Sequence, residues 1–315
     1  MPVYTIFTAP RQCNRGKNAL DKRGFFWYIV YVEKIGAKTP PGGKRMKKIP
    51  IGYQIYSARV DASKDLEGVL KSLKALGYDG VEFAGFFGRD PKELKKMMDD
   101  NGLIPVSNHC AVSLIEEDMF GAIAQHQAQG CRYVAVPYLE EARRPGTPGF
   151  ADVLRLIYQF GGLCSEAGMQ LLYHNHDFEF KEISGMYGLD FLYAALPPCR
   201  LKAEIDVCWV KYSGVDPAAY LRKYAGRVPI VHLKDYVGGN GTGTPYALIG
   251  QAKEADATAF EFRPFGYGCQ DVKTVVEAGI EAGAEWFVVE QDQWYDRTPM
   301  EAAKMSIGTL RELGL

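Results

Sequence analysis

Histidines and carboxylates recur at a few equivalent points of this sequence, each at the end of a short apolar run. The chain has five histidines, and four of them occupy such points: His109, His174, His176 and His232. Asp206 and Glu290 end two further runs. Imidazole and carboxylate groups together suit borderline divalent ions such as Mn, Co, Zn or Fe, and suit Mg less well. The sequence therefore predicts one divalent metal ion with four ligands: His174, Asp206, His232 and Glu290.

The chemistry expected of such an ion is removal of a proton from the carbon next to a carbonyl group. A cation bound to the carbonyl and the adjacent hydroxyl oxygen stabilises the enediolate as its charge develops. Glu290 or His176 would act as the base, with the other as the acid. Lys234 is expected to polarise the same oxygen or hold a sugar hydroxyl. A salt bridge from Lys234 to Asp206 or Asp235 is the alternative.

Four more side chains are expected to contact a carbohydrate substrate: His109, Trp209, Glu82 and Phe87. Trp209 and Phe87 would form apolar walls against a sugar face, although aromatic side chains are more often part of a core. His109 and Glu82 belong to the apolar runs whose ends are expected to face the substrate.

The elements that must position these residues follow a regular rhythm of apolar runs and longer amphipathic stretches, which is typical of repeated βα units. Eight runs predict strands: Ile51–Tyr56, Gly80–Phe83, Ile104–Asn108, Tyr133–Pro137, Gln170–His174, Leu201–Asp206, Ile230–Leu233 and Trp286–Glu290. Seven stretches predict helices: Leu66–Leu76, Pro91–Asn101, Phe120–Gln129, Phe150–Ala167, Asp216–Tyr224, Val272–Ala282 and Met300–Glu312. Glycines are expected to close five helices: Gly77, Gly102, Gly130, Gly168 and Gly283.

Eight successive βα units predict an α/β fold, a single (β/α)8 TIM barrel over residues 46–315. The alternative is an open doubly wound sheet, but no GxGxxG follows the first strand-like run. In barrel enzymes the active site lies at the C-terminal ends of the strands. The ends of the last four strands can therefore converge on one ion and leave the rest of the rim open to substrate.

Two segments break the rhythm. Residues 1–45 are rich in Lys, Arg, Gly and Pro, which predicts a poorly ordered N-terminal extension, and Met46 could be the true start of translation. Between Asp235 and Phe265 the chain contains the glycine-rich stretch Gly238–Gly243. This segment is expected to be a loop over the substrate face, with a disordered insertion as the alternative.

The composition favours a globular protein that acts on small molecules. The chain has 315 residues, of which 47% are hydrophobic, and its net charge is −1, so it lacks the basic footprint of a nucleic-acid-binding protein. No apolar run reaches the roughly 18–20 residues needed to cross a bilayer, which predicts no membrane association. The seven cysteines form no CxxC pair and suit a reducing cytoplasm.

From about Ile49 to its C-terminus the sequence resembles the sugar phosphate isomerase/epimerase superfamily, the xylose isomerase-like TIM barrels. The resemblance rests on four segments: Ile205–Trp209, Val231–Asp235, Pro264–Gly268 with Asp271 after it, and Val288–Glu290. It implies a metal-dependent sugar isomerase or epimerase, in which Asp206, His232 and Glu290 bind the metal. Barrels of this group often pair, so it also implies a homodimer or homotetramer.

The fifth strand departs from the pattern of this superfamily. Many members have Glu followed two residues later by His, where this chain has His174-Asn175-His176. The resemblance implies two metal-bound glutamates that exchange the proton in ketose epimerases, and this chain would keep one of them. Either Glu179 replaces the missing group as ligand or base, or the chemistry differs.

Three alternative functions follow from the same residues. The first is a lyase or dehydratase that expels a β-oxygen substituent from a keto-sugar, keto-inositol or keto-glycoside. The second is cleavage of abasic DNA, as in the endonuclease branch of the group, against which the near-neutral charge and the five histidines argue. The third is a binding or regulatory barrel without catalysis, which need hold no metal ion.

Overall fold

A computed structural model describes residues 48–239 and 260–315 of the chain. Contacts divide the chain into two compact units at Met46, and the described residues belong to the second unit, Lys47–Leu315. The predicted extension over residues 1–45 lies outside the described residues, as does most of the predicted loop between Asp235 and Phe265.

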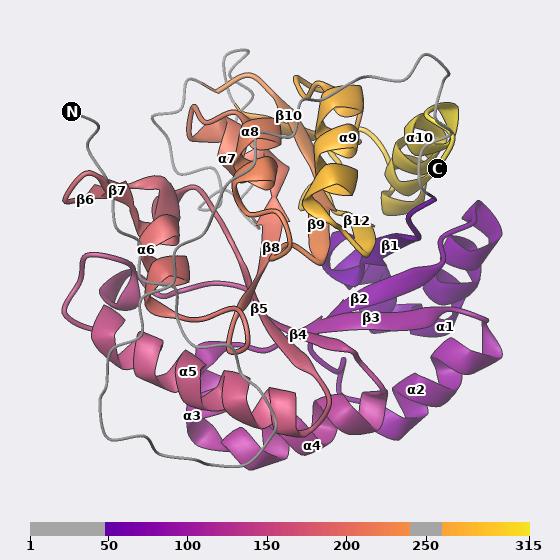
Figure 1. Ribbon diagram of the computed structural model, residues 1–315. Helices are drawn as coiled ribbons and strands as arrows, with labels where there is room; N and C mark the ends of the chain where they lie inside the picture. Colours follow the sequence, from indigo (N-terminus) through magenta and orange to yellow (C-terminus); the bar gives the residue numbers. More distant parts are fainter. Residues whose placement is uncertain (1–47, 240–259) are drawn as a thin grey trace, which may run out of the picture. The chain divides into compact units, whose positions relative to one another are not determined.

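Eight parallel strands close into a barrel with helices outside it (Figure 1). The strands are β1 (Ile51–Gln54), β2 (Gly80–Ala84), β3 (Ile104–His109), β4 (Tyr133–Val136), β5 (Gln170–His174), β8 (Lys202–Asp206), β9 (Ile230–Leu233) and β12 (Trp286–Val289). Around the barrel they run β1-β12-β9-β8-β5-β4-β3-β2, and β2 pairs with β1 to close the ring. Both faces of these strands are covered, which is why the runs read as nearly continuous apolar sequence. The predicted (β/α)8 barrel is confirmed.

The seven predicted helices are present: α1 (Arg59–Leu76), α2 (Pro91–Asp100), α4 (Met119–Gln129), α5 (Phe150–Glu166), α8 (Pro217–Lys223), α9 (Val272–Ala282) and α10 (Pro299–Glu312). Helix α1 begins at Arg59 rather than Leu66, and Asp65, with φ −145°, interrupts it. All five glycines expected to close helices have positive φ. In the described part of the chain, no helix is both long and apolar enough to cross a membrane.

Several short elements in the connections were not predicted. Three are helices: α3 (Val112–Glu117), α6 (Gly188–Ala195) and α7 (Val207–Tyr212). Three are single 3-10 turns: η1 (Ile55–Ala58), η2 (Glu141–Arg143) and η3 (Phe178–Phe180). Two antiparallel hairpins pair β6 (Glu182–Ile183) with β7 (Met186–Tyr187), and β10 (Asp235–Val237) with β11 (Glu261–Arg263). Periodicity does not reveal them because these helices have at most eight residues and these strands at most three, which is too short for a repeating apolar pattern.

An apolar cluster supports the site from inside the barrel. Its buried members come from β3, β4, β5, β9 and β12: Val106, Tyr133, Ala135, Leu172, Ile230, Trp286 and Val288. Side chains alternate between the two faces of a strand, so residues two positions further along face the same interior. His174 follows Leu172, His232 follows Ile230, and Glu290 follows Val288 in this way. A polar layer therefore lies on the apolar one, toward the C-terminal ends of the strands.

Asp235 holds the turn that follows the β10–β11 hairpin. Its carboxylate accepts five backbone N–H groups, from Tyr236, Gly266, Gly268, Cys269 and Gln270, at 2.9–3.1 Å. Gly268 approaches so closely that an added Cβ would lie 2.2 Å from Asp235 Oδ1.

Replacing Asp235 with asparagine is expected to lower the free energy of unfolding by about 2–4 kcal/mol. The amide group can turn only one acceptor oxygen toward the five N–H groups, so buried donors lose their partner. Urea denaturation measures the effect. Asp271→Asn is the matched control, because Asp271 caps α9 at the surface and asparagine caps equally well. Equal stability of the two variants would contradict the role given to Asp235.

Candidate metal centre

The four predicted ligands converge at the C-terminal ends of adjacent barrel strands. His174 ends β5, Asp206 ends β8, His232 lies in β9 and Glu290 follows β12. All four are buried, and each offers one ligand atom within 4.8 Å of the others. The structure thus brings together residues that lie far apart in the sequence, from His174 to Glu290.

Asp206 is positioned by contacts on both sides of it. Asn175 fixes its backbone: the Asp206 amide donates to Asn175 Oδ1 at 3.0 Å, and Asn175 Nδ2 donates to the Asp206 carbonyl at 3.3 Å. Asp206 Oδ1 caps α7 by accepting the amides of Cys208 at 2.8 Å and Trp209 at 3.4 Å. Oδ2 is buried and accepts no hydrogen bond from the described residues, and Lys234 Nζ lies 3.5 Å from it. A bound cation would complete the surroundings of this carboxylate oxygen.

In His174 and in His232, the two ring nitrogens face different carboxylates. His174 places Nδ1 3.2 Å from Glu204 Oε1 and Nε2 3.8 Å from Asp206 Oδ2. His232 places Nε2 2.8 Å from Glu82 and 3.2 Å from Glu204, while Nδ1 lies 3.0 Å from Glu290 Oε2. One nitrogen of each ring thus faces a fully buried glutamate, and the other faces Asp206 or Glu290. Two imidazoles and two carboxylates suit a divalent ion.

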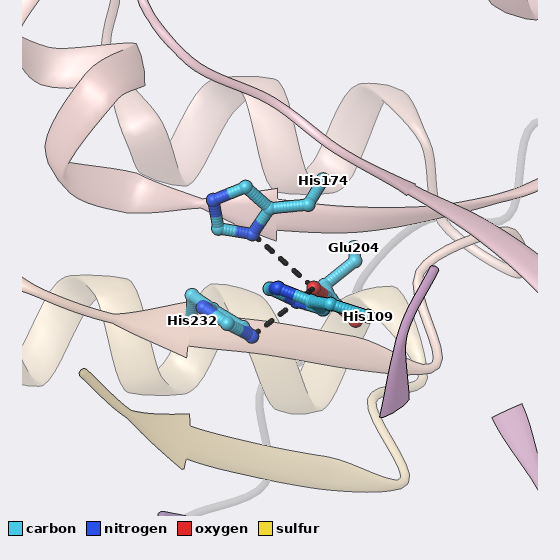
Figure 2. A group of neighbouring side chains, drawn as sticks. All are labelled: His109, His174, Glu204 and His232. Atoms are coloured by element: carbon cyan, nitrogen blue, oxygen red, sulfur yellow. Dashed lines mark hydrogen bonds and ion pairs between the residues drawn. The ribbon is translucent and has the colours of Figure 1, made fainter. Parts of the chain in front are cut away.

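A second group of possible ligands shares both rings and lies around Glu204: His109, His174, Glu204 and His232. Figure 2 shows the three rings gathered at the carboxylate. Glu204 Oε1 lies 3.1 Å from His109 Nε2 and 3.2 Å from a nitrogen of each of the other rings. Sequence reasoning did not nominate Glu204. The available signal was its spacing, because Glu204 stands two residues before Asp206 on the same face of β8.

Lys234 forms part of the polar layer. Its Nζ lies 2.6 Å from Asp292 Oδ2, 3.1 Å from Glu290 Oε2 and 3.5 Å from Asp206 Oδ2. Burial favours the neutral amine, but the carboxylates outweigh it and raise the pKa of Lys234 well above 10.5, so the group stays cationic. The alternative of a salt bridge to Asp206 is therefore present in the structure, whereas Asp235 binds backbone amides instead.

His176 lies at the edge of the site. Its ring centroid is 5.2 Å from that of His174, and its ring stacks on Trp209 at 5.3 Å and on Phe178 at 5.6 Å. Burial, followed by the nearby His174 and Lys234, lowers the pKa of His176 well below 6.5. The imidazole is therefore neutral at neutral pH and can accept a proton.

Three nominated residues are placed differently from their predicted roles. Glu179 accepts Tyr173 Oη at 2.6 Å and the His176 amide at 2.9 Å, so it anchors the loop after β5 and belongs to neither ligand group. Burial raises the pKa of Glu179 to about 8. Glu82 is fully buried, and its Oε1 lies 2.8 Å from His232 Nε2 and 2.9 Å from His109 Nε2, so it contacts the histidine rings of the site.

Trp209 is also fully buried, because α7 carries it into an aromatic cluster with Tyr212, Tyr236, Phe260 and Phe262. Its ring stacks on that of His176, and Lys234 Nζ lies 5.1 Å from the centroid of its ring. Trp209 therefore supports these two side chains. Phe87 lies in the loop after β2 and is partly exposed. The side chain of His109 is 9% exposed. The predicted substrate contacts of these two residues stay predictions.

Comparison with known proteins agrees with this geometry. The family model described as "Xylose isomerase-like TIM barrel" matches residues 70–313. The chain belongs to this family. The predicted resemblance to the xylose isomerase-like TIM barrels is thereby confirmed.

Among family relatives, an inosose dehydratase from Geobacillus kaustophilus is 26% identical over 53% of this chain and 61% of its own length. The chain thus spans less than two thirds of that relative. Four further inosose dehydratases align at 23–27% identity and are covered over 81–84% of their lengths.

Solved structures show the same fold at low sequence identity. A sugar phosphate isomerase/epimerase from Parabacteroides distasonis has 21% identity and a TM-score of 0.68, covering 86% of this chain and 98% of its own. The IOLI protein with a bound zinc atom has 14% identity and a TM-score of 0.64, covering 84% and 98%.

Proposed function

We propose that this chain is a metal-dependent lyase that eliminates water from a keto-inositol or a related keto-sugar. The observation that carries the proposal is the asymmetry of the ligand group: Glu290 is its only glutamate, and an imidazole, His174, stands where a second glutamate would be needed. An epimerase must return a proton to the face opposite the one it was taken from. An elimination needs one base and a group that assists the leaving oxygen. The five relatives named inosose dehydratase favour the same choice over the isomerase reading.

The metal ion would be held by His174, Asp206, His232 and Glu290, whose buried atoms fit a single cation. A bound divalent ion stabilises the negative charge that develops on the carbonyl oxygen when the neighbouring C–H bond is broken. The mixed ligand set favours Mn, Co, Zn or Fe over Mg. The zinc atom in the IOLI structure supports a divalent ion in this fold.

His176 is the base in this proposal. Its ring is neutral at neutral pH and lies beside His174, at the edge of the ligand group. Burial, outweighed by Lys234 and His232, leaves the pKa of Glu290 well below 4.5, so this carboxylate stays ionised and serves as a ligand in the proposal. His176 takes the α-proton and then delivers it to the departing hydroxyl, so that the C–O bond breaks and water leaves. Lys234 stays cationic and stabilises the carbonyl oxygen.

Incubation with a keto-inositol in deuterated water tests the proposal. We expect loss of one oxygen substituent as water and an unsaturated ketone, which absorbs in the ultraviolet. A ketose incubated in parallel should be returned without conversion. Recovery of a deuterated isomer from either substrate, with no elimination, would instead support the isomerase or epimerase function.

A further inference from the structure

We propose that Glu204 sets the tautomer of the metal-binding His174 and so decides which nitrogen of that ring meets the ion. This inference rests on the proposed metal site. Glu204 itself would touch neither metal nor substrate. It is a positioning residue, acting through His174.

Two ring nitrogens converge on one oxygen of Glu204: Nδ1 of His174 lies 3.2 Å from Oε1, and Nε2 of His109 lies 3.1 Å from it. An ionised carboxylate only accepts hydrogen bonds, so Nδ1 of His174 carries its hydrogen. A neutral imidazole has one such hydrogen, which leaves Nε2 of His174 with a free lone pair. Nε2 is the nitrogen that lies toward Asp206, 3.8 Å from its Oδ2.

Glu82 lies beside other rings than that of His174. Glu82 Oε1 accepts Gln54 Nε2 at 2.6 Å and also lies 2.8 Å from His232 Nε2 and 2.9 Å from His109 Nε2. His232 has a further partner, because its Nδ1 lies 3.0 Å from Glu290 Oε2. The only carboxylate paired with Nδ1 of His174 among the described residues is that of Glu204. Loss of Glu204 should therefore release His174.

The ion has an alternative position, in the ligand group around Glu204. That group contains one carboxylate, whereas the other contains two, Asp206 and Glu290. Two carboxylates balance a divalent charge in a buried site, and one leaves it half compensated. In addition, the nitrogens that face Glu204 lie at ordinary hydrogen-bond distances from it. The ion is thus assigned to the group with Asp206, above Glu204.

Nuclear magnetic resonance of 15N-histidine-labelled protein tests the tautomers directly. In the zinc-loaded chain, we expect His174 to carry its hydrogen on Nδ1 and bind through Nε2. The opposite tautomer at His174 would overturn the inference.

Metal affinity of variants gives an independent readout, measured with Co2+ by competition against a chelator and by its visible spectrum. Glu204→Gln keeps an acceptor oxygen and should stay close to the unmodified chain. Glu204→Met removes it and should weaken binding by about 10- to 100-fold, the usual effect of losing an outer partner of a ligand. His109→Ala should leave the affinity unchanged.

The remaining outcomes are also decisive. Equal, large losses in Glu204→Gln, Glu204→Met and His109→Ala would show that the ion sits on Glu204 itself, which overturns the inference. Unchanged affinity in Glu204→Met overturns it as well. If the unmodified chain bound no metal at all, the proposed function would fail before the question of tautomers arose. Circular dichroism checks that each variant is folded, and the labelled unmodified chain needs no variant.

Discussion

Replacing Asp206 with asparagine is expected to lower kcat/KM for elimination by about 1000-fold or more while the barrel stays folded. Asparagine can still accept the amides of Cys208 and Trp209 through Oδ1, since Asn and Asp are equally good helix caps. What it loses is the anionic Oδ2 that faces the ligand group. Steady-state kinetics and the metal content of the purified variant measure the two parts of the effect.

Asp216→Asn is the matched control for this substitution. Asp216 caps α8 in the same way, through the amides of Ala218 and Ala219, and lies outside the ligand group. It should bind metal and turn over substrate like the unmodified chain. Full activity and a full complement of metal in Asp206→Asn would refute the placement of the ion.

Replacing His176 with glutamine is expected to lower kcat by about 100- to 10,000-fold, the range attributed to a general base. Glutamine keeps a polar side chain of similar length but cannot accept the α-proton. The ligand group itself is untouched, so the affinity for Co2+ should be unchanged. Exchange of the α-hydrogen with deuterated water should disappear along with product formation.

The control for His176 is another buried histidine. His126 lies on α4, where its Nδ1 is 2.6 Å from the Ala122 carbonyl oxygen, and no part of the proposed mechanism uses it. His126→Gln should retain kcat even if it unfolds at a lower temperature. A His176→Gln variant that still exchanges the α-hydrogen at the normal rate would assign the base to a different group, with Glu290 the first candidate.

The barrel could be predicted because each strand is short, apolar on both faces and followed by a helical period of about 3.6 residues. The start of α1 could not, since Asp65 leaves helical geometry in the middle of the helix and hides the turns before it. The short helix α7 was missed for a different reason. It is held by the cap that Asp206 provides, a tertiary feature that the apolar pattern of Val207–Tyr212 does not reveal.

The four proposed ligands could be named because strands of a parallel barrel end on one face, which turns strand ends into spatial neighbours. Glu204 was not nominated, although its spacing from Asp206 places it on the same face of β8. That spacing does not show that three imidazole rings surround its carboxylate, because their orientation depends on the tertiary structure. Trp209 and Glu179 were nominated from their positions in the sequence, and the structure places both among other contacts. Both stand next to site residues in the sequence, but the chain turns after β5 and β8 and carries them into packed surroundings.

A crystal of the chain loaded with Mn2+ or Co2+, recorded at the absorption edge of the metal, tests the central claim most directly. The account predicts one anomalous peak per chain, about 2.0–2.2 Å from Nε2 of His174, Nδ1 of His232 and one oxygen each of Asp206 and Glu290. A peak bonded to Glu204 and His109, or the absence of any peak among the four predicted ligands, would contradict it.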